Sequence, residues 1–351
     1  MMQKITPKSN QYFFPAEWHP HVSTWITFPH NDHSWQKDKL SNMYPEYFAL
    51  IKAISLGEMV NINVDNEKLK SFILSQLAIY GIDENKINFH LHPTNDAWCR
   101  DHGPAFLIKK GSSERLMLDW GYNAWGGKYP PFDDDNRLPR AISEELNLPI
   151  LSPGIIMEGG SVEFNGAGTV LTSRSCLLNK NRNPHLTQEQ IETYLCDFYG
   201  VSQVLWVSDG IVGDDTDGHI DDTVRFVNED TVITMVEPKE DDENHAVLAQ
   251  NLRELKQMKL LSGKPLNIIE IPMPDPVVID EFRAPGSYAN FYICNAAVIV
   301  PIFHCPQDEF ALQTLSQLFV DRPVIGLSAR EIIWGQGSFH CLTQQEPMPC
   351  Q

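Results

Sequence analysis

The stretch Ala297-Val-Ile-Val-Pro-Ile302 is an apolar run, followed by the amphipathic segment 308–319 and a second apolar run, Val324-Ile-Gly-Leu327. Short β-branched runs predict buried strands, and apolar residues at helical spacing predict a helix that packs on them. Asp308 stands at the start of the amphipathic segment and is expected to cap its helix. This part of the chain is therefore predicted to fold as strand, helix and strand.

The same order of elements recurs about five times along the chain. Strands are predicted at 24–28, 59–64, 87–91, 105–109, 169–172, 204–207, 223–227, 231–236 and 266–271. Helices are predicted at 44–55, 67–80, 140–146, 187–199 and 243–259. The fourth helix opens with Thr187-x-x-Gln190, a capping-box pattern. This alternation predicts an α/β protein, built either as an open doubly wound sheet or as a closed ring of repeated units.

Charge limits the kinds of partner that the chain can bind. Its 351 residues include 46 acidic and 27 basic side chains, which gives a net charge of −19. Nucleic acid and anionic membrane surfaces need a basic face, so neither is an expected partner. A negative field concentrates cations instead, which favours a small cationic substrate or a metal ion.

Cysteine usage and hydropathy indicate the compartment. The seven cysteines are irregularly spaced and form no CxxC pair, which predicts a reduced, cytoplasmic chain without disulfides or a zinc site. The first residues lack the apolar region of a secretory signal. The longest apolar run, 296–303, is far too short to span a bilayer.

The segment Gly213-Asp-Asp-Thr-Asp-Gly-His-Ile-Asp-Asp222 carries five aspartates and one histidine. In an extended backbone, Asp215, Asp217, His219 and Asp221 would share one face. Two interpretations remain open: a solvated acidic loop, or a histidine acid/base flanked by carboxylates that hold a cationic substrate. A calcium loop does not fit, because the glycine spacing would leave the terminal ligand positions without oxygen side chains.

Two further segments contain carboxylates that could face a ligand. In Trp98-Cys-Arg-Asp101, an indole beside a carboxylate suits a planar cation, although Arg100 and Asp101 could equally form a structural ion pair. Glu158 precedes two glycines, which would let other groups approach the backbone closely.

One cysteine stands out as a possible nucleophile. Cys341 follows the glycine-rich segment 335–337. A histidine far away in sequence could act as the base that a nucleophilic cysteine needs. Most cysteines are small buried hydrophobes, so this position alone decides nothing. Cys176, Cys196 and Cys294 lie in apolar contexts and are assigned to packing, while Cys99, close to Asp101, is a lesser rival.

Taken together, these segments resemble the agmatine deiminase family, the guanidine-modifying branch that also includes bacterial peptidylarginine deiminase. The matching motifs are Thr27-Phe-Pro-His-Asn31, Asn95-Asp-Ala-Trp98-x-Arg-Asp101-x-Gly-Pro104, Asn123-x-Trp-Gly-Gly-Lys-Tyr-Pro130, Met157-Glu-Gly-Gly160, Cys176-Leu-Leu-x-x-Asn-Arg-Asn-Pro184, Gly213–Asp221, Ser287-Tyr-x-Asn-Phe-Tyr292 and His340-Cys-x-Thr-Gln-Gln345. The resemblance implies one catalytic domain over residues 1–351, built as a pseudo-fivefold α/β propeller of ββαβ units around a central site.

The resemblance also implies roles for individual residues. Cys341 would be the nucleophile, His219 the general acid/base, and Glu158 a carboxylate that supports His219. Asp101 and Asp221 would hold the guanidinium. It further implies a homo-oligomer, a place in polyamine synthesis, and no metal or organic cofactor. The chain departs from the family's usual Thr-Glu at Ser173-Arg174 and from its Gly-Gly-Gly at Gln336.

These roles lead to a hypothesis for agmatine hydrolysis to N-carbamoylputrescine and ammonia. Cys341 would form a covalent thiouronium intermediate. The surrounding carboxylates would raise the pKa of Cys341, so the cationic substrate itself would help to ionise the thiol. Asp215 is expected to bind the distal amine, and Trp98 to pack along the guanidinium.

Two other functions stay open at this stage. The chain could deiminate free or peptidyl arginine, although an α-carboxylate would need a cation such as Arg100, Lys128 or Arg174. It could also be a non-catalytic cation-binding module.

Overall fold

A computed structural model describes residues 6–350 of the chain, apart from the side chains at positions 37 and 38. The helices α1 to α9 span Lys37–Ser55, Glu67–Tyr80, Cys99–His102, Ala124–Gly127, Leu138–Leu146, Arg174–Leu177, Gln188–Tyr199, Glu243–Leu255 and Gln307–Leu318. The strands β1 to β10 span Tyr12–Phe13, His21–Thr27, Met59–Val64, Ile87–Leu91, Ala105–Lys109, Arg115–Leu118, Ile150–Leu151, Val162–Phe164, Thr169–Ser173 and Gln203–Val207. The strands β11 to β19 span Val224–Phe226, Thr231–Val236, Asn267–Pro272, Val277–Ile279, Phe282–Ala284, Tyr292–Ile293, Val298–Ile302, Val324–Ser328 and Thr343–Pro347. The predicted α/β class is confirmed.

The strands form separate small sheets, and no sheet within residues 6–350 closes on itself. Five sheets repeat one pattern, in which an antiparallel pair is followed by a parallel pair. These sets are β19-β2-β3, β5-β6-β7, β8-β9-β10, β11-β12-β13 and β16-β17-β18. A helix lies between the two parallel strands of each set along the chain: α1, α5, α7, α8 and α9 respectively. Parallel neighbours need such a crossover, which explains the alternation in the sequence.

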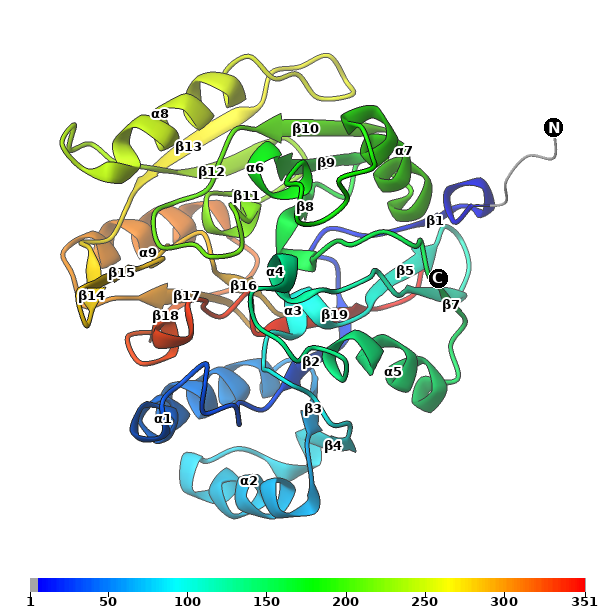
Figure 1. Ribbon diagram of the computed structural model, residues 1–351, viewed down its shortest axis with the longest axis vertical. Helices are drawn as coiled ribbons and strands as arrows, with labels where there is room; N and C mark the ends of the chain where they lie inside the picture. Colours follow the sequence, from blue (N-terminus) through cyan, green and yellow to red (C-terminus); the bar gives the residue numbers. More distant parts are fainter. Residues whose placement is uncertain (1–5, 351) are drawn as a thin grey trace.

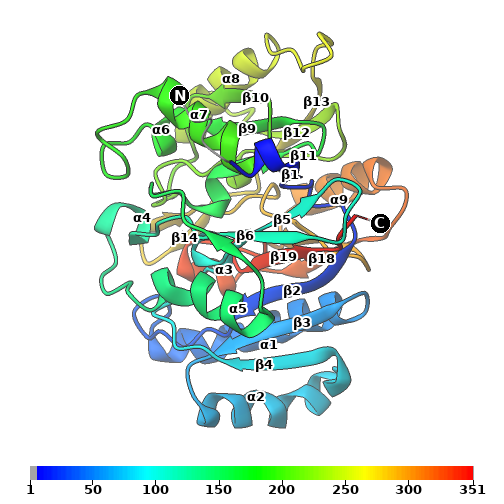
Figure 2. The ribbon, with the colours of Figure 1, turned by 90° about the vertical axis from the view of Figure 1, so that its right-hand side faces the viewer.

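The two ends of the chain meet in one sheet. Strand β19 pairs antiparallel with β2, and Figure 2 shows red β19 lying next to blue β2. All five residues of β19 are buried. Its sequence, Thr-Gln-Gln-Glu-Pro, carries no apolar pattern, and so the strand was not predicted. This pairing fixes Cys341, which precedes β19 by two residues, in the interior.

The long helices lie on the outside of the molecule. In Figure 1, α2 and α8 occupy opposite ends, while α3 and β19 lie near the centre. Within the described residues, no helix is long and apolar enough to cross a membrane. The first five residues, which bear on the expected lack of a secretory signal, lie outside the described part.

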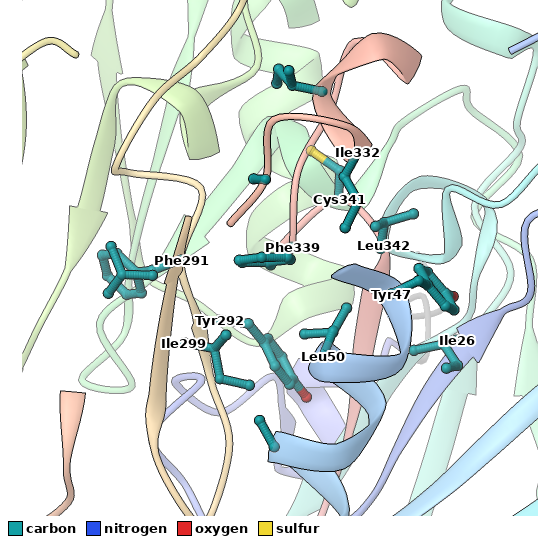
Figure 3. Packing of buried hydrophobic residues seen from close by; sticks show 14 of the residues in the cluster. Ile26, Tyr47, Leu50, Phe291, Tyr292, Ile299, Ile332, Phe339, Cys341 and Leu342 are labelled. Carbon is teal, nitrogen blue, oxygen red and sulfur yellow. The ribbon is translucent and has the colours of Figure 1, made fainter. Parts of the chain in front are cut away.

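The largest apolar cluster joins α1, β2, β3, β17 and α9 and reaches the nucleophile candidate. Figure 3 shows Cys341 beside Ile332, Phe339 and Leu342. Those three neighbours are fully buried. Tight packing of this kind limits backbone movement, so the cysteine is held in a defined position.

Several predicted boundaries were wrong. Helix α1 begins at Lys37 and continues through Pro45, and α8 ends at Leu255 instead of 259. Asp308 is not the N-cap of α9, because that helix begins one residue earlier. Its carboxylate instead accepts hydrogen bonds from the backbone N–H groups of Phe303 and Cys305, and so stabilises the preceding turn.

The predicted capping box of α7 is confirmed. The Thr187 hydroxyl accepts from the backbone N–H of Gln190, whose side chain accepts from the Thr187 N–H at 2.8 Å. We expect Thr187→Ala to lower the free energy of unfolding by about 1 kcal/mol, because the helix loses this cap. Urea denaturation measures the change.

The matched control is Thr193→Ala in the same helix. Its exposed hydroxyl donates to the carbonyl of Glu189 within the helix, and its loss should change stability by less than about 0.5 kcal/mol. Equal losses in both variants would show that the cap contributes nothing specific.

Candidate active site

Four segments that are distant in sequence converge near the centre of the molecule. Asp101 lies on α3, and Glu158 precedes a short 3-10 helix, Gly159–Ser161. Asp221 lies in a second 3-10 helix, Ile220–Asp222, which directly follows His219. These elements contact one another, and α3 also contacts β19.

Gly160 permits this close approach. A Cβ atom at position 160 would lie 2.5 Å from His219 Nδ1 and 2.9 Å from Asp101 Oδ1. No side chain fits at such distances, so the glycine after Glu158 is required for the carboxylates and the imidazole to meet.

A cavity of about 650 Å³ opens beside these residues. It is lined by His30, Asn31, Asp32, His33, Ser34, Thr94, Asn95, Asp96, Trp98, Asp101, Tyr122, Ala124, Trp125, Lys128, Tyr129, Pro130, Pro131, Asp135, Asp215, Thr216, Gly335, Gln336, Gly337 and Cys341. Four residues predicted from sequence therefore share its wall: Trp98, Asp101, Asp215 and Cys341. His219, Glu158 and Asp221 are buried and are not among the lining residues.

Cys341 is a buried thiol in an acidic environment. Its side chain is buried, and its Sγ accepts a hydrogen bond from Asn290 Nδ2 at 3.0 Å. The sulfur lies 3.7 Å from Asp221 Oδ2. Burial raises the pKa of the thiol well above its usual value, and the charges of Asp221, Asp222 and Asp101 add to the shift. The site without a cation therefore favours the neutral thiol.

His219 lies between two carboxylates without a hydrogen bond to either. Nδ1 is 3.8 Å from Asp101 Oδ1, and Nε2 is 3.9 Å from Glu158 Oε2. Neither ring nitrogen has a hydrogen-bond partner among the described residues. Burial works to lower the pKa of the imidazole, but Asp101 and the neighbouring Cys176 and Glu158 outweigh it, so the pKa is raised well above its usual value. The ring is therefore a proton donor at neutral pH.

Asp101 is oriented by two donors. Its Oδ1 accepts from the backbone N–H of Gly160 at 2.9 Å, and its Oδ2 from the indole N–H of Trp125 at 3.1 Å. Burial raises the pKa of this carboxyl to about 6, a rise that His219 opposes and Asp221 and Glu158 increase.

Asp221 and Glu158 are held in the ionised form. Burial opposes this state, but His340 lowers the pKa of Asp221, and Arg182 lowers that of Glu158. Arg182 Nε donates to Glu158 Oε1 at 2.6 Å. In contrast, Asp221 Oδ1 is buried without any hydrogen-bond partner within the described part of the chain, so its hydrogen-bonding capacity is unsatisfied.

The acidic segment 213–222 is not an extended strand, so the prediction of one shared face was wrong. It forms turns, with positive φ at Gly213, Asp217 and Gly218. The Asp214 carboxylate accepts from the backbone N–H groups of Gly218 and His219, each at 3.0 Å, and thereby stabilises the turn.

The other aspartates of the segment have partners in distant parts of the chain. Asp217 pairs with Lys128 at 2.8 Å and with Arg182. Asp222 Oδ1 accepts from Asn290 Nδ2 at 2.9 Å. Asp215 accepts from the hydroxyl of Tyr129, and burial raises the pKa of its carboxyl to about 6.

Two indoles flank the cavity, and the sequence interpretation named only one. Trp98 stacks on Trp35 with ring centroids 5.1 Å apart, and Gly335 and Gly337 pack closely against its ring. Trp125 is the indole that hydrogen-bonds Asp101. The signal for Trp125 was its place in the motif 123–130.

The candidate cations for an α-carboxylate are largely occupied. Arg100 pairs with Glu17 at 3.2 Å, so its predicted alternative pairing with Asp101 is wrong. Arg174 is partly exposed and pairs with Glu254 at 3.4 Å. Among the described lining residues, Lys128 is the single lysine or arginine, against five aspartates.

Gln336 replaces a family glycine yet has φ of +70°, in the left-handed region that favours glycine, and it lines the cavity. Cys176 packs in an apolar cluster, as predicted, but its Sγ is also 4.0 Å from Glu158 Oε2.

Two groups among the described residues could hold a metal ion: Glu158, Cys176 and His219, and separately Asp221, Asp222 and Cys341. Arg182 already neutralises Glu158 in the first group. In the second, the Asp222 carboxyl has a strongly raised pKa because it is buried near Asp221 and Asp214. Such an arrangement is also suited to a planar organic cation, whose N–H groups can satisfy several carboxylate oxygens at once.

Comparison with known proteins shows the family of the chain. Residues 13–347 match the family described as Porphyromonas-type peptidyl-arginine deiminase, and the chain belongs to that family.

The similar proteins include agmatine deiminases. The enzyme of that name from Stutzerimonas stutzeri is 34% identical, with 98% of each chain covered. The agmatine deiminase structure from Enterococcus faecalis is 29% identical over 99% of each chain, with a TM-score of 0.89. A substrate-bound agmatine deiminase from C. jejuni is 31% identical over 97% of each chain, with a TM-score of 0.87.

The acidic environment of Cys341 leads to a prediction for the free protein. Because its pKa is raised, alkylation of Cys341 by iodoacetamide should be slow at pH 7 and should still increase with pH above 9. Mass spectrometry of the modified peptide follows the reaction, with Cys341→Ser as the background. A rate that reaches its plateau below pH 7 would contradict the raised pKa.

Proposed function

We propose that this protein is an agmatine deiminase, a hydrolase that converts agmatine and water to N-carbamoylputrescine and ammonia. The observation that carries the proposal is the cavity that Cys341, Asp101 and Asp215 line together. A thiol that can attack a carbon atom lies there among carboxylates that can hold a cation. The full-length similarity to agmatine deiminases supports the same function.

Binding brings the guanidinium to the thiol. Asp101 and the free Oδ1 of Asp221 accept N–H bonds from the guanidinium and fix its plane. The positive charge offsets the repulsion that raises the pKa of Cys341, so the thiol loses its proton to solvent when the cation binds. The thiolate then attacks the central guanidino carbon.

His219 moves the protons of the two following steps. As an imidazolium it protonates the departing nitrogen, and ammonia leaves as the carbon–nitrogen bond breaks, which leaves a thiouronium on Cys341. The neutral imidazole then takes a proton from water, and the resulting hydroxide attacks the thiouronium carbon. The carbon–sulfur bond breaks, and N-carbamoylputrescine and the thiol are released. Glu158 favours the charged imidazole in this scheme.

The distal amine of agmatine is assigned to Asp215, and Trp98 to the wall along the guanidinium. The excess of aspartates over the single lysine of the cavity favours a second positive charge on the substrate. Deimination of free or peptidyl arginine is the alternative. It is less favoured, because Arg100 and Arg174 are engaged by Glu17 and Glu254.

The five similar strand sets are consistent with a pseudo-fivefold α/β propeller of ββαβ units, formed by residues 1–351 as one catalytic domain. We also propose a homo-oligomer in the cytoplasm, with a role in putrescine synthesis.

The reaction is tested by incubating the protein with agmatine, arginine or an arginine peptide and measuring ammonia and product mass. Agmatine should gain about 1 Da as one nitrogen is replaced by oxygen, and Cys341→Ala should abolish turnover. Greater turnover of arginine would favour the alternative enzyme, and full activity of Cys341→Ala would exclude the covalent route. Binding of agmatine without any turnover would instead indicate a cation-binding module.

The amine assignment predicts a selective effect of Asp215→Asn. KM for agmatine should rise roughly tenfold or more, because a charged hydrogen-bond partner is lost. Butylguanidine, which lacks the distal amine, provides the matched control, and its KM should not change. If KM for agmatine were equal in the variant and the wild type, the assignment of Asp215 would be wrong.

A further inference from the structure

His340, the residue before the nucleophile, lies between two buried carboxylates. Its Nδ1 is 2.7 Å from Asp221 Oδ2, and its Nε2 is 2.8 Å from Glu17 Oε2. The side chain of His340 is 2% exposed. Ionised carboxylates only accept hydrogen bonds, so both bonds require a proton on each ring nitrogen. The geometry therefore corresponds to an imidazolium that donates in both directions.

Glu17 is itself fixed from several sides. Arg225 Nη2 lies 3.0 Å from Oε1, and Arg100 Nη2 lies 3.2 Å from Oε2. The backbone N–H of Ile293 also donates to Oε1, at 2.8 Å. Burial opposes ionisation, but Arg225 and His340 hold the pKa of Glu17 far below its usual range. Glu17 is therefore an anion with a fixed position.

The charges of this network balance. Arg225 Nε also pairs with Glu163 at 2.9 Å, so three carboxylates face three cations. The members come from distant parts of the chain: Glu17 precedes β2, Arg225 lies in β11, and His340 precedes β19. A buried ion pair is stable only when its partners are all present, so removing one member affects the others.

The network fixes the directions in which the two carboxylate oxygens of Asp221 point. His340 and the Cys341 thiol occupy Oδ2, while Oδ1 has no partner among the described residues. With Oδ2 bound, the carboxylate cannot rotate without breaking a short charge-assisted hydrogen bond.

We propose that His340 and Glu17 are positioning residues, which fix Asp221 so that Oδ1 receives the guanidinium next to Cys341. This inference rests on the proposed function for the identity of the cation. Neither residue touches the substrate, and both act through Asp221.

The test compares two amides at position 340. The amide nitrogen of His340→Asn can take the place of Nδ1 and still donate to Asp221, whereas that of His340→Gln reaches toward Glu17 instead. We expect His340→Gln to lose on the order of 100-fold in kcat/KM for agmatine, mainly through a higher KM. His340→Asn should lose no more than roughly tenfold. Glu17→Gln should also raise KM, because the ring is no longer held by an anion.

His21→Asn is the matched control. His21 forms an equally buried pair with Glu58, with Nδ1 and Oε1 2.9 Å apart, but it does not contact Asp221. This variant should lower Tm while kcat/KM stays within about twofold of the wild type. Equal losses of kcat/KM in His340→Asn and His340→Gln, or wild-type KM in Glu17→Gln, would overturn the proposal.

A second measurement needs no substrate. His340→Gln releases Asp221 Oδ2, which lies 3.7 Å from Cys341 Sγ, so the rate of Cys341 alkylation should differ from the wild type in this variant and stay close to it in His340→Asn. Absence of ammonia release from agmatine by the wild type would refute the proposed function alone. Unchanged alkylation in both variants would count against the role of His340.

Discussion

The candidate active site depends on the compensation of buried carboxylates by buried guanidinium groups of the same chain. Arg182 pairs with Glu158 and Asp217, and the fully buried Arg225 pairs with Glu17 and Glu163. An unpaired buried charge destabilises the folded protein by several kcal/mol, so these two arginines allow the carboxylates to be buried together. The carboxyls of Asp101 and Asp222 lack such a partner and have raised pKa values. These two carboxyl groups therefore still lack a cationic partner.

The same electrostatic field raises the pKa of both groups that would react in the proposed mechanism. The His219 imidazole therefore favours its charged, protonated form, while the Cys341 thiol favours its neutral form. In the proposed mechanism, a bound cation lowers the pKa of the thiol again, while the imidazolium keeps its proton to donate. In the proposed mechanism the negative field therefore couples binding to activation, since the thiolate of Cys341 forms only when the cation is in place.

Most regular elements could be predicted, because their hydrophobic spacing is local. Strands β3, β4, β5 and β12 and helix α2 have the predicted bounds. Strand β19 escaped prediction, since its polar residues are buried by neighbouring strands and not by an apolar pattern of its own. For the segment 213–222 the sequence left an acidic loop and an extended face of carboxylates open, and its glycines and the Asp214 carboxylate close it into turns. In both segments, tertiary contacts determine the backbone conformation more strongly than the residue pattern of the segment itself.

The sequence by itself determined the alternation of strands and helices, the acid excess, and the motifs that contain Asp101, Glu158, His219 and Cys341. Those features depend on residue identity and on spacing within short segments. Only the tertiary structure decided which carboxylate meets which cation. Glu17 and His340 are 323 residues apart, and their contact exists because β19 returns to pair with β2. Pairing across such a distance is set by the packing of whole elements, and no local spacing encodes it.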